Sequence, residues 1–186
     1  MGSGRPAWEE LLGGVEWVSV AGRDPELIAR QWAEAPPVAG GVRAAIDRGA
    51  DPAAELAKLL ERAGFGEALR EAAAWGWPVT VAVNDAHRLT DTRAALGALF
   101  AVAEKVGSSG PFRLLVAAGS HRAGASERRA HEQSILAGYR ARFCEIRWHE
   151  CEDASWLAEV GPAAVHRWLA EPGLRIGVGS LEPHYF

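Results

Sequence analysis

The sequence has few cysteines, no long apolar run and no excess of positive charge. Only two cysteines occur among 186 residues, so we expect a cytoplasmic protein with reduced thiols rather than a disulfide-stapled secreted one. No apolar run approaches the roughly 20 residues that cross a bilayer, and the polar N-terminus lacks an apolar signal core. The net charge of -4 argues against a broad nucleic-acid surface. We therefore expect neither a membrane nor a nucleic-acid partner.

The remaining composition is that of an ordinary globular domain. Hydrophobic residues make up 48% of the chain and charged residues 24%. A chain of 186 residues is long enough for one full core and short for two. We expect a single domain over 1–186, with a helix-rich N-terminal portion at 1–77 and a βαβ core at 78–186.

The N-terminal portion shows structural signals without recognisable chemistry. Asp24-Pro25 and Asp51-Pro52 each place an N-cap carboxylate before proline at the first helical position. The pattern predicts one strand at 15–20 and helices over 6–12, 24–35, 52–64 and 65–75. It shows no metal-ligand spacing, phosphate loop or pair of carboxylates on one helical face.

From Pro78 onward, short apolar runs alternate with helical patterns. The runs predict strands over 79–83, 114–118, 143–148 and 174–179, and the intervening patterns predict helices over 91–106, 126–137 and 162–170. This alternation is typical of βαβ units with right-handed crossovers. The sequence therefore predicts an α/β fold: a Rossmann-like open, mostly parallel sheet with flanking helices.

All four predicted strands end in acidic, basic or imidazole side chains, and parallel strands bring such ends to one edge, where open α/β folds bind ligands. The residues are Asp85 and Arg88, His121 and Arg122, His149 and Glu150, and Glu182 and His184. Two histidines can serve as a paired general acid and base, because imidazole titrates near neutrality. The carboxylate can orient a histidine or bind a hydroxyl, and the guanidinium can bind a carboxylate or phosphate. If they point at a ligand, the backbone amides of residues 119–122 favour an anion near the start of the following helix.

The same residues also have purely structural interpretations. Asp85 can simply cap its turn, with Arg88 as its ion-pair partner. We expect no function for the three histidines on helices or at the surface, which are His87, His131 and His166. The Cys144, His149 and Cys151 group has an unusual zinc spacing and supplies only three ligands, so we assign no metal ligand. Strand periodicity instead places Cys144 and Trp148 together on the core face.

Three segments together resemble the N-terminal domain of the nickel-pincer lactate racemase family, over roughly residues 78–186. The family motifs are Asp-Ala-Thr-Arg-Pro-Thr-Pro, Gly-Thr-His-Arg-Pro and Gly-x-x-Glu-Pro-His-Phe-Phe. The corresponding segments here are Asp85-Ala86-His87-Arg88-Leu89-Thr90, Gly119-Ser120-His121-Arg122, and Gly179-Ser180-Leu181-Glu182-Pro183-His184-Tyr185-Phe186. Their order and approximate spacing also agree with the family.

The resemblance implies a nickel-pincer nucleotide cofactor that takes hydride from the α-carbon of a small 2-hydroxy acid and returns it to either face. It implies catalytic roles for His121 and His184, which exchange the hydroxyl proton from opposite faces. We assign cofactor binding to five residues: Asp85, Arg88, Gly119, Ser120 and Arg122.

The sequence also departs from the family pattern. Leu89 and Asp91 replace two prolines, His87 replaces a threonine, and Ala123 replaces a third proline. The family continues into a cofactor-attaching lysine, a nickel-ligating histidine and a second domain, and neither Lys58 nor Lys105 matches the attaching lysine.

We therefore expect half of a split enzyme or a truncated copy. Such a chain does not retain the cofactor alone, is inactive alone, and pairs with a partner chain or with itself. The first alternative is a non-catalytic binding module for an anionic small molecule or a protein partner. The second is a degenerate domain that binds no ligand.

Overall fold

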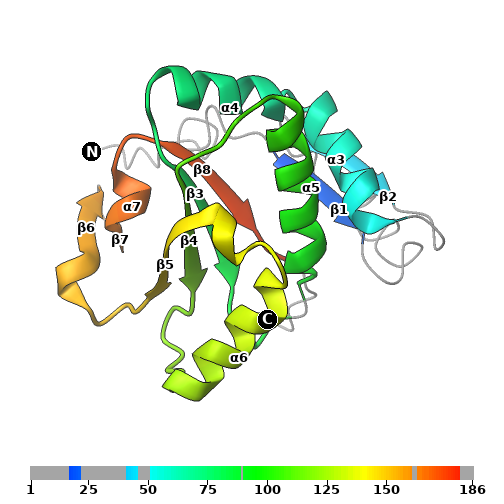
Figure 1. The fold of residues 1–186 in the computed structure, drawn as a ribbon. Coiled ribbons are helices and arrows are strands. Elements are labelled where there is room, and N and C mark those ends of the chain that lie inside the picture. Colours follow the sequence, from blue (N-terminus) through cyan, green and yellow to red (C-terminus); the bar gives the residue numbers. More distant parts are fainter. Residues whose placement is uncertain (1–16, 22–40, 46–50, 89, 161–162, 181–186) are drawn as a thin grey trace, which may run out of the picture.

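The computed structural model describes residues 17–21, 41–45, 51–88, 90–160 and 163–180. A sheet of four parallel strands lies at its centre, in the order β5-β4-β3-β8 (Figure 1). The strands are β3 (Val79–Asn84), β4 (Phe112–Ala117), β5 (Phe143–His149) and β8 (Leu174–Val178). Because all neighbouring strands are parallel, their carboxyl ends share one edge, which confirms the predicted α/β sheet.

The order of the strands creates a switch point beside β3. The chain runs outward from β3 to β4 and β5, then returns to place β8 on the other side of β3. Val83 of β3 pairs with Val116 on one side and with Val178 on the other. Open α/β sheets bind ligands at such a reversal, outside the carboxyl ends of the strands. The end of β3 therefore occupies the expected position of a ligand site.

Four helices cover one face of the sheet and form the main core with it (Figure 1). They are α3 (Pro52–Arg62), α4 (Phe65–Ala74), α5 (Thr92–Lys105) and α6 (Ala125–Leu136), and all four were predicted from the sequence. The Asp51 side chain accepts a hydrogen bond from the Ala53 N–H at 3.1 Å, as the Asp-Pro signal predicts. Alternate strand residues, including the fully buried Val81 and Leu114, meet Leu96 and Phe100 of α5 in this core.

The segment between β5 and β8 corrects one sequence prediction. A helix was expected over 162–170, but β7 (Ala163–His166) forms a strand that pairs antiparallel with β6 (Leu157–Val160). Among the described residues of this segment, α7 (Arg167–Ala170) is the one α-helix, and a short 3-10 turn lies at Ala154–Trp156. Pairing with β6 satisfies the backbone of the alanine-rich stretch, so tertiary context outweighs its helical propensity.

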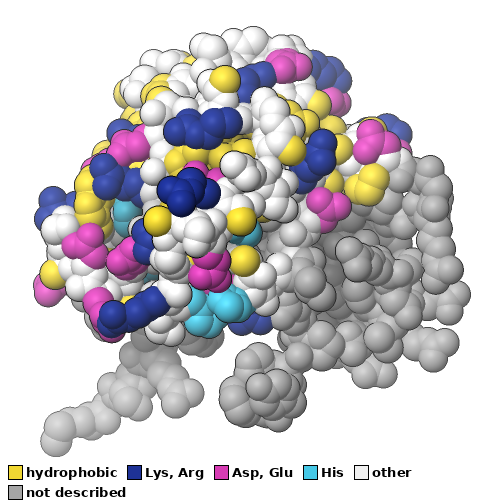
Figure 2. Space-filling model, turned by 60° about the horizontal axis from the view of Figure 1, so that its bottom comes forward, with side chains coloured by type: hydrophobic (Ala, Val, Ile, Leu, Met, Phe, Trp, Pro, Cys, Tyr) yellow, Lys and Arg dark blue, Asp and Glu magenta, His cyan; other side chains and the backbone are white. Residues whose placement is uncertain are grey.

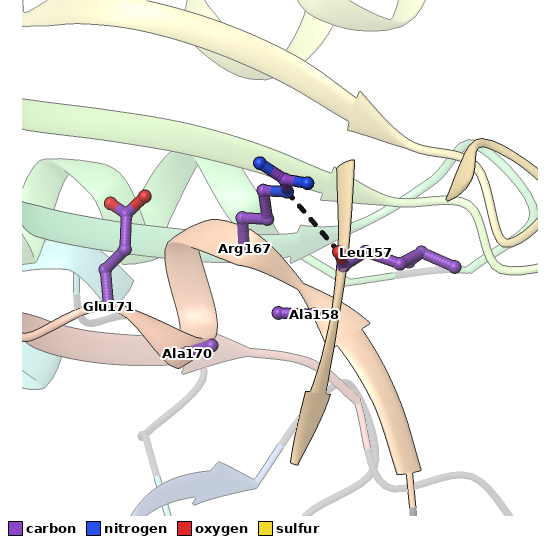
Figure 3. Close-up of a pocket in the computed structure, with 5 residues that line it drawn as sticks. All are labelled: Leu157, Ala158, Arg167, Ala170 and Glu171. Carbon is purple, nitrogen blue, oxygen red and sulfur yellow. Dashed lines mark hydrogen bonds between the residues drawn. The ribbon is translucent and has the colours of Figure 1, made fainter. Parts of the chain in front are cut away.

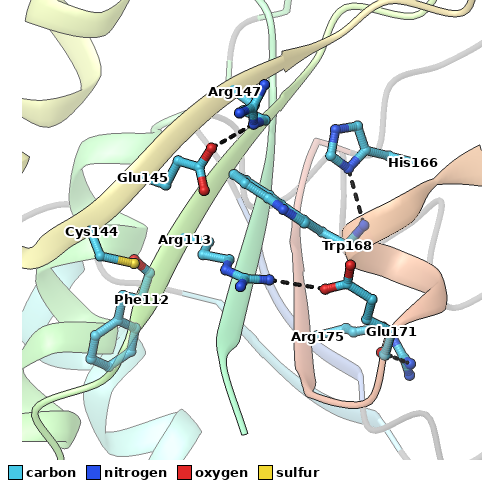
Figure 4. Close-up of polar contacts among 9 residues, drawn as sticks. All are labelled: Phe112, Arg113, Cys144, Glu145, Arg147, His166, Trp168, Glu171 and Arg175. Atoms are coloured by element: carbon cyan, nitrogen blue, oxygen red, sulfur yellow. Dashed lines mark hydrogen bonds and ion pairs between the residues drawn. The ribbon is translucent and has the colours of Figure 1, made fainter. Parts of the chain in front are cut away.

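This segment packs against charged residues of β4 and β5 (Figure 4). Arg113 forms an ion pair with Glu171 at 3.1 Å. The Arg147 guanidinium lies 3.5 Å from the ring centroid of Trp156. Arg113 also lies over the buried ring of Trp168, 5.2 Å from its centroid. These paired charges explain how charged strand residues are accommodated on a partly covered face.

A bulge in β5 corrects the expected position of Cys144. Phe112 pairs with Phe143, but Arg113 pairs with Glu145, so Cys144 is the extra residue. Its side chain is exposed, and its thiol donates to the Phe112 carbonyl at 3.1 Å (Figure 4). The prediction that Cys144 shares the core face with Trp148 is therefore wrong, because the bulge breaks the alternation that the prediction assumed.

The N-terminal portion contains a second, two-stranded sheet. β1 (Trp17–Ala21) pairs in parallel with β2 (Gly41–Ala45), and no sequence signal predicted β2. The helices predicted over 6–12 and 24–35 lie outside the described residues. Within the described part of the chain, no helix has both the length and the apolar character needed to span a membrane.

Candidate functional site

The candidate site lies where β3 and β4 end. Asn84, the last residue of β3, pairs with Ala117, and Ala117 pairs with His149 of β5. The polar residues that follow these strands are therefore brought to one edge, as the sequence predicts. Figure 2 shows this edge turned toward the viewer, with a group of histidine side chains next to acidic and basic ones.

Asp85 and His121 form the centre of the site. His121 Nδ1 lies 2.6 Å from Asp85 Oδ2, so the ring N–H donates to the carboxylate across 36 positions of sequence. The Asp85 side chain is 7% exposed and that of His121 is 50% exposed. The other carboxylate oxygen, Oδ1, accepts the backbone N–H of His87 at 3.1 Å. A buried carboxylate therefore orients an accessible imidazole.

The Asp85 carboxylate stays ionised despite its burial. Burial raises its pKa, but the hydrogen bonds from the His121 ring and the His87 backbone, together with the charges of both imidazoles, outweigh that effect. The pKa of Asp85 is therefore lowered from its ordinary value. An ionised carboxylate at this position favours a proton on the Nδ1 atom of His121.

His87 belongs to the same cluster, although the sequence analysis gave it no function. Its ring lies against that of His121, with centroids 4.4 Å apart and planes at 60°. Candidate ligand atoms of Asp85, His87 and His121 all lie within 4.8 Å of one another. His87 is exposed, as expected, but the turn after β3 brings it beside the other histidine. The Asp-x-His spacing at a strand end is the signal that could have identified it.

The other predicted binding residues lie in the loops around this cluster. Arg88 is exposed, and its backbone N–H donates to the Asp85 carbonyl at 3.4 Å. Gly119 adopts φ +61°, a conformation that favours glycine, and Ser120 beside it is exposed. Arg122 forms an ion pair with Glu152, in the loop after β5. The structure therefore places Arg88 in the turn that begins at Asp85, while Arg122 is engaged by a different loop.

A short polar network connects the ends of β3 and β8. Asn84 Nδ2 donates to Thr90 Oγ1 at 2.7 Å, and Thr90 Oγ1 lies 3.2 Å from Ser180 Oγ. His131 Nε2 donates to the Asn84 carbonyl at 3.0 Å, which gives this histidine a structural contact. The segment after β8 therefore begins beside the Asp85 turn. His184 and Glu182, four and two positions beyond Ser180, lie outside the described residues.

The end of β5 does not form the zinc group considered above. Cys144 is the second residue of β5 and Cys151 lies two residues beyond its last, so most of the seven-residue strand separates them. Such a strand extends about 20 Å, far beyond the span of one ion. Glu150 pairs with Arg128 of α6. Among the described residues, the buried Nδ1 of His149 and Nε2 of His166 have no hydrogen-bond partner.

A separate pocket lies between β6 and α7 (Figure 3). The lining residues are Leu157, Ala158, Arg167, Ala170 and Glu171. Arg167 Nε donates to the Leu157 carbonyl at 3.4 Å and so holds the two elements together. None of the predicted site residues line this pocket, and we do not assign it to the candidate site.

The fold and the Asp85–His121 pair define an open α/β domain with its polar site at the topological switch point. A family model for the lactate racemase N-terminal domain matches residues 38–186. The chain therefore belongs to the lactate racemase N-terminal domain family. The match confirms the resemblance of the three motifs and extends it from about residue 78 back to residue 38. A comparison with curated proteins finds no match.

Proposed function

We propose that this chain forms one wall of a 2-hydroxy acid racemase or epimerase centre, in which His121 transfers the proton of the substrate hydroxyl. The observation that carries the proposal is the 2.6 Å contact between His121 Nδ1 and the buried Asp85 carboxylate. With Nδ1 bound in this way, Nε2 is the ring nitrogen that exchanges the proton. The carboxylate fixes the tautomer of His121 and stabilises the imidazolium that forms.

Arg88 is the residue that we propose binds the substrate carboxylate. Its backbone N–H donates to the Asp85 carbonyl, so Arg88 belongs to the same turn as Asp85. A guanidinium matches a carboxylate by two parallel hydrogen bonds. We propose the same proton-transfer role for His184 on the opposite substrate face, on the basis of its family motif and the position of Ser180 beside Thr90.

The described residues fit part of the cofactor that the family implies. A Cβ added at Gly119 would meet no atom within 4 Å, so a ligand has space beside this turn. The exposed hydroxyl of Ser120 provides a polar group for a nucleotide phosphate nearby. When bound, a nickel-pincer nucleotide supplies the hydride chemistry that imidazole, carboxylate and guanidinium groups lack.

The described residues do not provide a covalent attachment for that cofactor. Lys58 of α3 pairs with Glu55, and Lys105 at the end of α5 pairs with Glu61. Both lysines lie on helices that cover one face of the sheet, whereas the site lies at the carboxyl edge of the sheet. We therefore propose that a second domain, on the same polypeptide or on a partner chain, attaches the cofactor. The 50% exposure of the His121 side chain supports a site completed from outside.

A domain exchange tests this proposal. In the exchange protein, this chain replaces the N-terminal domain of an active lactate racemase, and the exchange protein is expressed with the cofactor. Chiral chromatography follows the interconversion of D- and L-2-hydroxy acids. We expect racemisation that is absent from the same enzyme lacking any N-terminal domain. We also expect Arg88→Gln to raise KM more than it lowers kcat, because the guanidinium binds the unreacting carboxylate.

Two other results would change the assignment. A folded exchange protein that binds the acids but does not racemise them would favour the non-catalytic binding module. A folded exchange protein that neither binds nor racemises them would contradict both functions.

A further inference from the structure

Three side chains of different kinds meet at the end of β3. The carboxylate of Asp85 and the imidazoles of His87 and His121 present ligand atoms that all lie within 4.8 Å of one another. Among the described residues, this is the one group of three or more histidine, cysteine or acidic side chains with that geometry. We propose that Asp85, His87 and His121 bind a divalent transition-metal ion of the zinc class directly, independently of the proposed racemase function.

The donor set has the composition of a known kind of metal site. Two histidines and one carboxylate suit Zn²⁺ and the neighbouring divalent ions, and such sites keep positions open for water or substrate. The exposed side chain of His87 and the half-exposed side chain of His121 leave the ion a path from solvent. An open position on the ion would accept a small carboxylate or hydroxy acid.

The distances require only a small adjustment. Ligand bonds of about 2.0–2.1 Å at tetrahedral angles separate two ligand atoms by about 3.3 Å. His121 Nδ1 and Asp85 Oδ2 are 2.6 Å apart, so the ion must replace the shared proton and widen this contact. The accessible ring of His121 can rotate to provide that space, whereas the buried Asp85 remains in place.

The surroundings of Asp85 hold the group in position. The His87 backbone N–H binds Asp85 Oδ1, which fixes the turn that carries the second imidazole. Because Oδ1 of Asp85 accepts the His87 N–H, its other oxygen, Oδ2, is directed toward His121. The two rings already touch, at 4.4 Å between centroids, so His87 does not have to cross open solvent to join the ion. Preorganisation of this kind reduces the ordering cost of binding.

Zinc titration of the full, tag-free chain tests the site without any racemase assay. Isothermal calorimetry measures Zn²⁺ affinity and stoichiometry, and Co²⁺ absorption reports the ligand types. All variants carry Cys144→Ser and Cys151→Ser, which exclude thiolate binding by the two exposed cysteines. We expect one ion per chain. His87→Gln and His121→Gln should each weaken binding about 100-fold or more, because ligand loss exceeds the 10–100-fold effect of outer-shell changes.

His131→Gln is the matched control, because this histidine contacts the Asn84 carbonyl and lies outside the group of three. It should leave Zn²⁺ affinity within about twofold of the parent. Circular dichroism confirms that each variant is folded, and both tested histidines are exposed, so their replacement spares the core. Absence of binding in the parent, or equal affinity in the parent and in His87→Gln, overturns the proposal. Racemase activity does not enter either outcome, so failure of one proposal does not imply failure of the other.

Discussion

Replacing Asp85 by Asn and His121 by Gln, singly and together, measures the strength of the contact at the centre of the site. Asp85→Asn keeps an oxygen for the His87 N–H but removes the charge that His121 contacts. A hydrogen bond to a charged group contributes about 1.5–3 kcal/mol when buried. The His121 side chain is 50% exposed, and solvent screening reduces the expected coupling to about 1 kcal/mol.

Urea unfolding at pH 6 in the presence of a chelator gives the four free energies of the cycle. The pKa of Asp85 is lowered below 3.8, so its stabilising contribution is complete above that value and is lost as the pH falls through the folded-state pKa. A coupling energy below about 0.3 kcal/mol, the usual error of additivity, would refute the argument.

Three further changes test the fold around the site. Burial, followed by the charges of His149 and Arg147, lowers the pKa of His166. As the pH is lowered below about 6.5, the unfolded chain therefore binds a proton before the folded chain does, and the free energy of unfolding falls by up to about 1.4 kcal/mol per pH unit. His166→Phe should flatten that slope in urea titrations. Gly119→Ala should cost about 1 kcal/mol, because φ is +61° although nothing blocks the new methyl group; an unchanged urea midpoint would contradict this. Leu114→Ala should cost about 2–5 kcal/mol by creating a cavity in the fully buried core, and a calorimetric loss below 1 kcal/mol would contradict the packing described.

The sequence predicts the parallel core well because its signals are local and strong. The apolar runs around Val81 and Leu114 can be buried on both faces only in a covered sheet, and the Asp51-Pro52 signal marks the start of α3. Since parallel strands end at one edge, the meeting of Asp85 and His121 follows from their positions just after two such strands. The meeting of these two side chains was therefore predictable from the topology of the sheet.

The features that were missed depend on contacts distant in sequence or on turn geometry. The bulge at Cys144 arises from the register between β4 and β5, which alternation within β5 does not reveal. β7 is a strand because β6 pairs with it, although its alanines favour a helix. His87 reaches His121 because the Asp85 side chain closes the turn through the His87 N–H. Each of these outcomes requires the partner strand or the closed turn to be known.

The central claim is that His121, oriented by Asp85, moves a proton of the substrate. The most direct test is the kcat of the domain-exchange racemase with His121→Gln, compared with the parent and with the control His131→Gln. Glutamine is similar in size to histidine but cannot exchange a proton near neutral pH. We predict that kcat falls about 100- to 10,000-fold in His121→Gln and stays near the parent value in His131→Gln. An equal kcat in the parent and in His121→Gln would contradict the claim.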